Sequence, residues 1–286
     1  MNKIAYVVLH YITIDLTKNC VDSILNNNKS NYHIVIVDNG SKDNTGIELE
    51  YYYRNNNKVD VILLEENLGF AKGNNVGISY AKNILRANFV CCLNNDTQLM
   101  QNNFFEIVIK EYKKSEAAVI GPEILLIDNS IQKFPEDLKS LEYYNKELKK
   151  LRSEKSIIGR IKKLTLRYTV IAKIKSFKKR MRLQKYNIER KENVIVHGCC
   201  FVFTPSFFKK MSGFDPRTFM YREEAILFVQ LNKKNLKSVY LPELKIKHLE
   251  GMATKAAYNK SEEKLTFIRN TKAKSIEVLI SEMKNF

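Results

Sequence analysis

Residues 89–98 read FVCCLNNDTQ. An apolar run rich in β-forming residues stops abruptly at Asn94, Asn95 and Asp96, which predicts a buried parallel strand that delivers a carboxylate to the carboxyl edge of a sheet. Open α/β sheets bind their ligands at that edge. A carboxylate there is suited to holding a divalent cation against a diphosphate, because hard cations prefer oxygen ligands. The alternative is an Asx turn that only ends a strand.

Strands and helices are predicted to alternate on both sides of this stretch. Short apolar runs predict strands at residues 4–9, 34–37, 59–64, 117–120, 194–203, 237–241 and 246–248. Apolar residues at helical spacing predict helices at residues 15–25, 47–54, 104–112 and 264–284, the first with Asp15 as its N-cap. Gly121-Pro122 is expected to close the strand before it. This order predicts parallel crossover units and an α/β fold.

Residues 67–77 read NLGFAKGNNVG and are expected to open a helix that runs to about Leu85. Glycines let the backbone approach a ligand, a helix N-terminus favours anions, and Lys72 adds a positive charge. The glycines lack the GxGxxG spacing, so a dinucleotide-binding fold is only weakly supported. A plain connection between a strand and a helix is the alternative.

Two adjacent carboxylates, Glu223 and Glu224, stand where a helix to about Lys234 is expected to begin. The positive end of the helix dipole favours acidic side chains at such a position, which explains the pair without any function. The functional interpretation is that one of them is a general base.

The length of 286 residues suits one large domain or two small ones. No apolar run approaches the roughly 20 residues of a membrane-spanning helix, and the N-terminus does not resemble a cleaved signal, so a cytoplasmic protein is expected. The five cysteines lack the spacing of a zinc site and are expected to be reduced and mostly buried.

Most of the net charge of +17 falls in one segment. Residues 139–191 hold 19 Lys and Arg against 4 Glu and no Asp, a balance of +15. Within it, residues 157–185 have apolar side chains at helical spacing between basic ones, which indicates an amphipathic helix on anionic lipid. A helix that covers the domain with solvated lysines, and a site for a nucleic-acid backbone, are the alternatives. Because no nucleic-acid-binding module is recognisable, nucleic acid is not expected as a partner.

Five stretches, taken together and in this order, resemble glycosyltransferase family 2, most closely its bacterial polysaccharide branch of rhamnosyl- and galactofuranosyltransferases. They are IVIVDNGSKDNT, NLGFAKGNNVGI, VCCLNNDT, HGCCFVFTPSFFKKMSGFDPRTFMYREE and IKHLEG. The resemblance implies the GT-A fold of nucleotide-diphospho-sugar transferases, with a mostly parallel central sheet flanked by helices. It implies a catalytic domain over residues 1–260, with a basic helical insertion at about 128–191, and a C-terminal helix at 261–286.

The resemblance also assigns residues to the donor sugar nucleotide and to a metal. Asp38 would bind the nucleotide base and Lys72 the diphosphate. Asp96 would hold Mg²⁺ or Mn²⁺, with His248 as a further ligand. The remaining donor-binding positions implied are Asn67, Gly69, Asn75 and Asn95.

The acidic pair takes the place of the family's ED motif, so Glu224 would be the general base and Glu223 an acceptor-site or orienting residue. Three departures from the family pattern stand out. Asn94 replaces the first acid of the metal motif, Glu224 replaces an aspartate, and Ile226 replaces an aspartate two residues further on. Asn94 leaves Asp96 as the acid of the metal motif, and the changes at Glu224 and Ile226 leave the assignment of the base between the two glutamates open.

The sequence thus predicts an inverting, metal-dependent glycosyltransferase. Its donor would be a dTDP- or UDP-sugar, with dTDP-rhamnose suggested by the resemblance alone, and its acceptor a lipid-linked glycan or growing surface polysaccharide. It is expected on the cytoplasmic face of the membrane, held there by residues 157–185. The alternatives are a non-enzymatic membrane- or nucleic-acid-binding protein on a degenerate transferase scaffold, and a nucleotidyltransferase.

Overall fold

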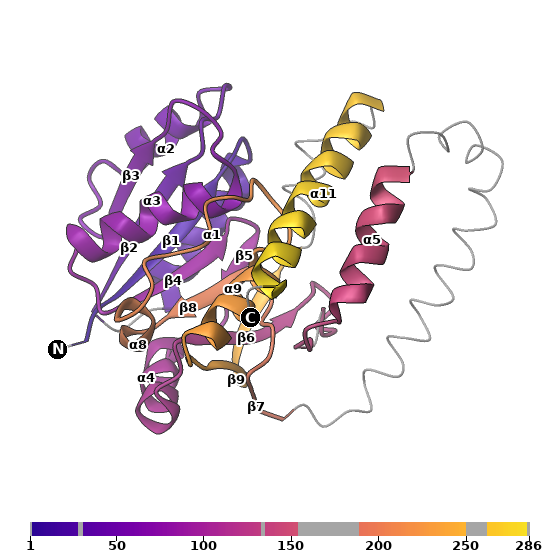
Figure 1. The fold of residues 1–286 in the computed structure, drawn as a ribbon. Helices are drawn as coiled ribbons and strands as arrows, with labels where there is room; N and C mark the ends of the chain where they lie inside the picture. The colour runs from indigo at the N-terminus through magenta and orange to yellow at the C-terminus, as the bar shows by residue number, and fades with distance from the viewer. Residues whose placement is uncertain (1, 28–30, 133–134, 154–188, 250–261, 285–286) are drawn as a thin grey trace.

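The computed structural model describes residues 2–27, 31–132, 135–153, 189–249 and 262–284. Within these residues a nine-stranded mixed sheet has the order β3-β2-β1-β4-β8-β6-β9-β5, with β7 paired to β9 (Figure 1). The strands are β1 (Ile4–His10), β2 (Tyr32–Asp38), β3 (Val59–Leu63), β4 (Phe89–Asn94), β5 (Thr97–Leu99), β6 (Val119–Leu125), β7 (Lys191–Glu192), β8 (Cys200–Phe203) and β9 (Ser238–His248). The helices are α1 (Ile14–Asn27), α2 (Thr45–Tyr53), α3 (Gly69–Asn83), α4 (Phe104–Ser115), α5 (Leu141–Ser153), α8 (Pro205–Phe208), α9 (Glu223–Lys233) and α11 (Glu262–Lys284).

The first four strands in the sheet order are parallel, and helices join them. β1 pairs in parallel with β2 and with β4, and β2 pairs in parallel with β3. Beyond β4 the sheet is mixed, because β8 runs antiparallel to β4 and to β6. The α/β architecture predicted from the sequence is confirmed, and the carboxyl ends of β1, β2 and β4 meet at one edge.

The sheet is covered on both faces, and β1 shows how its residues divide. Ile4, Tyr6 and Val8 belong to a core cluster with side chains of α1, α2 and α4. Ala5 and Val7 face the opposite side, in a cluster with α3, α8 and α9. This alternation follows from the two-residue period of a strand. On the α3 side the helix lies close, because a Cβ added at Gly77 would be only 2.3 Å from Cγ1 of Val7.

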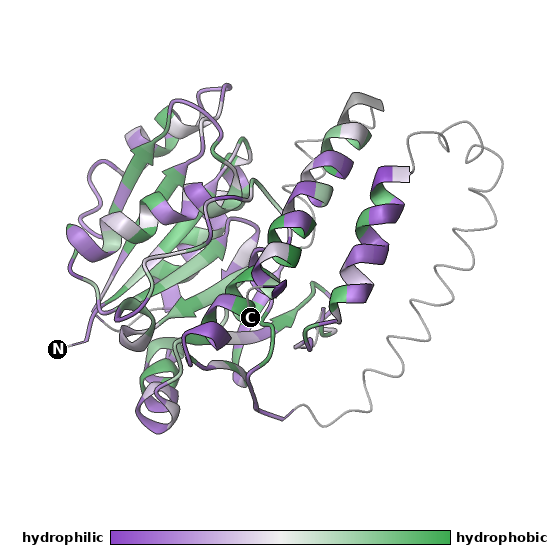
Figure 2. Ribbon diagram, viewed as in Figure 1, coloured by the Kyte–Doolittle hydropathy of each residue, from purple (hydrophilic) through white to green (hydrophobic). Residues whose placement is uncertain are grey.

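A third core cluster joins α5, α9 and α11. Tyr144 and Leu148 of α5 pack with Ile276 and Leu279 of α11 and with apolar residues of α9. In Figure 1, α5 and α11 lie side by side, away from the parallel half of the sheet. Figure 2 shows α5 as mainly hydrophilic, with a few apolar residues. Helix α9 is therefore buried between the sheet and the α5–α11 pair.

Several expected boundaries were wrong. Strand β6 continues through Gly121-Pro122 with a register shift against β9, so this dipeptide does not close it. Residues 194–203 form a strand only over Cys200–Phe203, and the two expected late strands are parts of β9. Helix α1 begins at Ile14, so Asp15 lies in its first turn and is not the N-cap. The limits of the strands are set by pairing with neighbouring strands of the sheet, which the local sequence pattern does not reveal.

Other expectations are settled for only part of the chain. The C-terminal helix forms, as α11, whereas the basic helix predicted at residues 157–185 lies outside the described residues. The five cysteines are buried and free, as expected. In the described segments we find no helix that combines the length and the apolar character needed to cross a membrane.

Candidate active site

Asp96 and His248 meet at the end of the sheet. Asp96 lies between β4 and β5, and β5 pairs antiparallel with β9 so that Thr97 is opposite His248. Nε2 of His248 lies 3.1 Å from Oδ1 of Asp96, and both residues are buried. The two residues that the resemblance to glycosyltransferase family 2 assigned to a metal are therefore adjacent in space.

This pair fits a divalent cation in two respects. Nδ1 of His248 lies 2.5 Å from Oε1 of Gln132 and its Nε2 lies 3.1 Å from Oδ1 of Asp96, so contacts at both ring nitrogens hold the imidazole in place. An imidazole nitrogen and a carboxylate oxygen are both atoms that ligate divalent cations in proteins. Adjacent ligands of an octahedral ion, each about 2.1 Å from it, are about 3 Å apart, close to the Nε2–Oδ1 separation.

In the part of the chain that the structure describes, no third His, Cys, Asp or Glu joins Asp96 and His248 in a metal-binding group. A divalent cation held by one or two protein ligands normally completes its coordination with water and substrate phosphates. The donor set therefore fits a cation that binds together with a diphosphate.

The three residues of the Asn94-Asn95-Asp96 motif point to different surroundings. Asn95 is buried, and its Nδ2 donates to the hydroxyls of Thr13 and Thr17, which ties this turn to α1. Asn94 lines a pocket, and its side chain makes no hydrogen bond to the other described residues. The structure thus places Asn95, a predicted donor-binding residue, in contact with α1, and Asn94 at the wall of a pocket.

Asp38 and Asn67 lie in a polar cluster at the ends of β2 and β3. Oδ1 of Asp38 accepts hydrogen bonds from the backbone N–H and the hydroxyl of Ser41, at 3.2 and 2.5 Å. Asn39, which sequence analysis did not select, links the cluster: its Nδ2 donates to Oδ1 of Asn67 and to the carbonyl of Gly69. Asp38 and Asn39 are buried and Asn67 is partly exposed, and a pre-ordered set of two amides and a carboxylate is suited to hydrogen bonding with the polar edge of a ring.

Gly69 begins α3 in a conformation that requires glycine. Its φ is +82°, and an added Cβ would lie 2.3 Å from the carbonyl oxygen of Phe219. The neighbouring Phe70 N–H donates to that same oxygen at 2.6 Å. The predicted donor loop is therefore bound directly to the segment that precedes the acidic pair.

Two predicted donor-binding residues, Lys72 and Asn75, lie on α3 in different surroundings. Both polar groups of the Asn75 side chain are engaged by the backbone of Phe214, at 2.8 and 2.9 Å. Lys72 is exposed in the first turn of α3 and is not among the residues that line the pocket beside Asn94. Asn75 thus acts here as a tie between α3 and the turn at Gly213.

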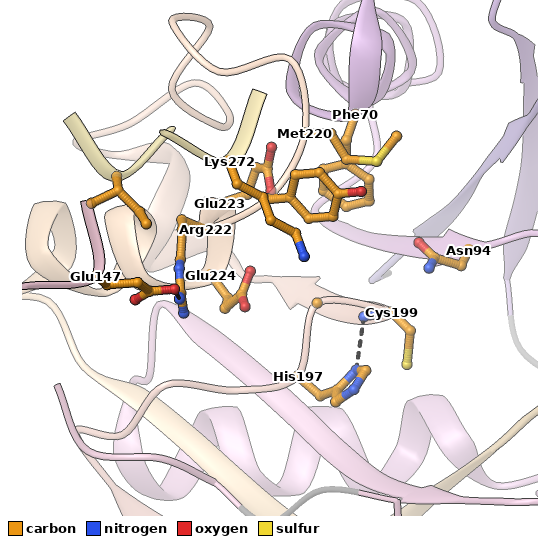
Figure 3. Close-up of a pocket in the computed structure, with 13 residues that line it drawn as sticks. Phe70, Asn94, Glu147, His197, Cys199, Met220, Arg222, Glu223, Glu224 and Lys272 are labelled. Atoms are coloured by element: carbon orange, nitrogen blue, oxygen red, sulfur yellow. Dashed lines mark hydrogen bonds and ion pairs between the residues drawn. The ribbon is translucent and has the colours of Figure 1, made fainter. Parts of the chain in front are cut away.

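A pocket of about 420 Å³ lies between the carboxyl edge of the sheet and the helices α9, α11 and α5 (Figure 3). This volume is within the usual range for small-molecule sites. Thirteen residues line it: Phe70, Asn94, Glu147, His197, Gly198, Cys199, Met220, Tyr221, Arg222, Glu223, Glu224, Lys272 and Ile276. The ring of His197 lies 6.0 Å from that of His248, so the pocket borders the Asp96–His248 pair.

The two adjacent glutamates, Glu223 and Glu224, differ in their surroundings. Glu223 is buried, and burial, reinforced by the charge of Glu224, raises its pKa to about 7. Its Oε1 has no hydrogen-bond partner among the described residues. Glu224 is half-buried, and its carboxylate lies over the backbone of Gly198, where an added Cβ would be 3.6 Å from Oε2. Of the adjacent pair, Glu224 is the one that combines a position in the pocket with partial access to solvent.

The turn that carries these glutamates holds two residues in the left-handed region. Tyr221 has φ 80° and Arg222 has φ 69°, which cost about 1–2 kcal/mol each for residues with a Cβ. An ion pair between Arg222 and Glu147 of α5, at 2.5 Å, fixes the turn from outside. Strain of this kind persists only where the surroundings enforce it, and it is concentrated at functional sites.

Sequence analysis missed four residues that the structure brings to the site: Asn39, His197, Arg222 and Lys272. Asn39 and Arg222 are next to selected residues, so their proximity was a usable signal. Lys272 lies on α11, almost fifty positions from the acidic pair, and no local pattern marks it among the other lysines of that helix.

The architecture is that of the GT-A glycosyltransferases. Residues 7–212 match the model of the family described as glycosyl transferase family 2. Since this range is most of the chain, the protein belongs to glycosyl transferase family 2. Glycosyltransferase GlyG of Streptococcus pneumoniae serotype 4 is 30% identical over 117 residues, which are 41% of this chain and 37% of GlyG.

Solved structures share the fold at low sequence identity. The structure of S. aureus TarS 1-349 in complex with UDP aligns with a TM-score of 0.53 and 14% identity, over 86% of this chain and 60% of that chain. The structure of GalNAc-T7 with UDP, GalNAc and Mn²⁺ aligns with a TM-score of 0.57 and 14% identity, over 86% of this chain and 43% of that chain. Nothing in these comparisons supports the non-enzymatic scaffold or the nucleotidyltransferase.

Proposed function

We propose that this glycosyltransferase transfers a sugar, with inversion at the anomeric carbon, from a nucleoside-diphosphate donor to a glycan hydroxyl. The observation that carries the proposal is the pocket itself. It holds a half-buried carboxylate, Glu224, on one wall and borders the Asp96–His248 pair on another. A base for the acceptor and a cation site for the leaving diphosphate are the two chemical requirements of such a reaction.

The acceptor hydroxyl attacks the anomeric carbon while the bond from that carbon to the diphosphate breaks. Glu224 takes the hydroxyl proton, since it lines the pocket and is accessible. Asp96 and His248 would hold a Mg²⁺ or Mn²⁺ ion, which supplies positive charge to the departing diphosphate. Asp38, with Asn39 and Asn67, is proposed to bind the nucleotide base.

The donor is proposed to be a UDP- or dTDP-sugar. TarS and GalNAc-T7, which share the fold, are described with UDP, and GalNAc-T7 also with Mn²⁺. Rhamnose as the sugar, and a lipid-linked or surface polysaccharide as the acceptor, come from the resemblance of the five sequence motifs. The domain limits at residues 260 and 261 and the basic insertion are likewise proposed from the sequence.

Attachment to the membrane surface is part of the proposal. Its support is the charge balance of +15 over residues 139–191. The test is cosedimentation with vesicles of neutral lipid and with vesicles that contain anionic lipid. Binding that does not depend on anionic lipid would contradict the proposal.

A thermal-shift series with UDP, dTDP and GDP, each with and without Mn²⁺, tests the donor site. At a hundredfold excess of ligand over Kd, binding adds about 2.7 kcal/mol of stability. We expect one nucleotide to raise the melting temperature only with the metal, and Asp96→Ala to abolish the shift. Asp60→Ala is the matched control, because Asp60 pairs with His33 at 2.8 Å near the start of β3 and does not line the pocket. No shift with any nucleotide would overturn the proposed function.

A further inference from the structure

Lys272 brings a positive charge into the pocket from the C-terminal helix. It lies on α11 and lines the same pocket as Asn94 and Glu224. Figure 3 shows its ammonium group projecting from the helix into the pocket and, in this view, lying between those two residues. Residue 272 lies beyond the range matched by the family model, so the family match assigns it no role.

Among the described residues, the ammonium group of Lys272 has no carboxylate partner. Three carboxylates line the pocket with it, those of Glu147, Glu223 and Glu224, yet no ion pair joins Lys272 to any of them in the described structure. Glu147 pairs with Arg222 instead. The contact of Lys272 that the structure shows is with the ring of Tyr221, whose centroid is 4.9 Å from Nζ. An aromatic face orients an ammonium group without using up its hydrogen-bond donors.

The position of Asn94 suggests which ligand the charge serves. Asn94 stands two residues before Asp96 and contributes an uncharged amide to the pocket wall. A carboxylate at this position would compete with a diphosphate for the ammonium group. With an amide there, the positive charge of Lys272 can act on an anion that bridges the pocket and the Asp96–His248 pair.

We propose that Lys272 is a catalytic residue that binds the β-phosphate of the nucleoside-diphosphate leaving group. The inference rests on the proposed function and deepens it. As the bond between the anomeric carbon and the β-phosphate oxygen breaks, its electron pair stays on that oxygen. The acceptor proton goes to Glu224, and Lys272 donates hydrogen bonds to the phosphate oxygens whose charge increases. Helix α11 thereby becomes part of the active site.

The test compares the affinity of Lys272→Ala for a nucleoside diphosphate and for the corresponding monophosphate. The nucleotide is the one that stabilises the wild type with Mn²⁺, and Kd is measured by calorimetry. We expect Lys272→Ala to weaken diphosphate binding by about 10- to 100-fold, the usual effect of losing a hydrogen bond to a charged group. Monophosphate binding, which lacks the β-phosphate, should change little, and kcat should fall.

Two variants serve as controls. Lys274→Ala removes another exposed lysine of α11 that does not line the pocket, and it should match the wild type in both affinities and in kcat. Lys272→Arg keeps the positive charge and should recover most of the diphosphate affinity. Melting temperatures of the variants without ligand establish that each is folded.

Three results would overturn the inference. Unchanged diphosphate affinity in Lys272→Ala would do so, as would equal losses for the diphosphate and the monophosphate. An effect confined to the KM of the acceptor would assign Lys272 to the acceptor instead. If the wild type binds no nucleoside diphosphate, the proposed function itself is contradicted. If the wild type binds it and Lys272→Ala binds it equally well, only the role of Lys272 is contradicted.

Discussion

His248 presents its Nε2 to Oδ1 of Asp96 at 3.1 Å, although 152 residues separate them in the chain. The antiparallel pairing of β5 with β9 creates this contact, and Gln132 fixes the ring from its other nitrogen. Histidine and carboxylate ligands supported in this way bind metals more strongly than unsupported ones. The pair thus connects the end of the chain's last strand to the motif after β4.

His248→Ala should weaken the Mn²⁺-dependent binding of a nucleoside diphosphate by about 10- to 100-fold. The loss follows from removing one of two protein ligands while Asp96 remains. Titration of Mn²⁺ at a fixed nucleotide concentration measures it. His33→Ala is the control, since His33 forms the comparable pair with Asp60. Equal Mn²⁺ affinity in the His248 variant and the wild type would remove His248 from the metal site.

Glu224→Gln should lower kcat by about 10²- to 10⁴-fold and leave the Kd of the nucleotide unchanged, because only proton transfer is lost. Release of nucleoside diphosphate during sugar transfer measures the rate. Glu223→Gln is the comparison, since it removes the other carboxylate of the pair. A wild-type rate for Glu224→Gln with a large loss for Glu223→Gln would reverse the assignment of the base.

Glu223 should make stability depend on pH. Burial raises its pKa from 4.5 to about 7, so the protonated form stabilises the fold below pH 4.5, and this contribution is lost as the pH rises through 7. The shift corresponds to roughly 3 kcal/mol. Urea unfolding between pH 4.5 and 8 should show Glu223→Gln gaining stability relative to the wild type by about that amount.

The control for this pH dependence is Glu50→Gln, which removes an exposed carboxylate of α2. Its stability should follow that of the wild type across the same range. If Glu223→Gln also follows the wild type, the Glu223 carboxylate does not titrate near neutral pH.

Gly69→Ala should destabilise the protein by about 2–4 kcal/mol. The methyl group would meet the carbonyl oxygen of Phe219 at 2.3 Å, and φ of +82° is unfavourable for alanine. Chemical denaturation measures the free energy of unfolding. Gly198→Ala is the matched control, because its Cβ would meet only Oε2 of Glu224, at 3.6 Å. A Gly69 variant as stable as the wild type would contradict the described start of α3.

Asn75→Ala should reduce stability by about 1–3 kcal/mol, because it leaves the N–H and carbonyl of Phe214 without their partners. The Kd of the nucleotide should stay the same once the variant is folded. Asn83→Ala, on the exposed end of α3, controls for the loss of an amide. A stable variant with weakened nucleotide binding would support the donor-binding role of Asn75 that the resemblance implies.

Predictions from sequence succeeded where the signal is local. The strand at Phe89, the helix at Gly69 and the acidic pair at the start of α9 follow from apolar runs, glycine positions and helix-end preferences that neighbouring residues determine. They failed at β6 and β8, whose limits depend on which distant strand lies alongside. The hydrogen-bond partners of Asn75 and Asn95, at Phe214 and in α1, could not be predicted either, because they are remote in sequence.

The sequence by itself determined the α/β alternation, the family and the residue types available for catalysis, because periodicity and motifs are properties of the chain. Only the tertiary structure decided which of those residues share a site. It joined Asp96 to His248, engaged Asn75 with a turn, buried Glu223 beside the more accessible Glu224, and brought Lys272 of α11 into their pocket. The physical reason is that strand pairing and helix packing bring together groups that no sequence spacing relates.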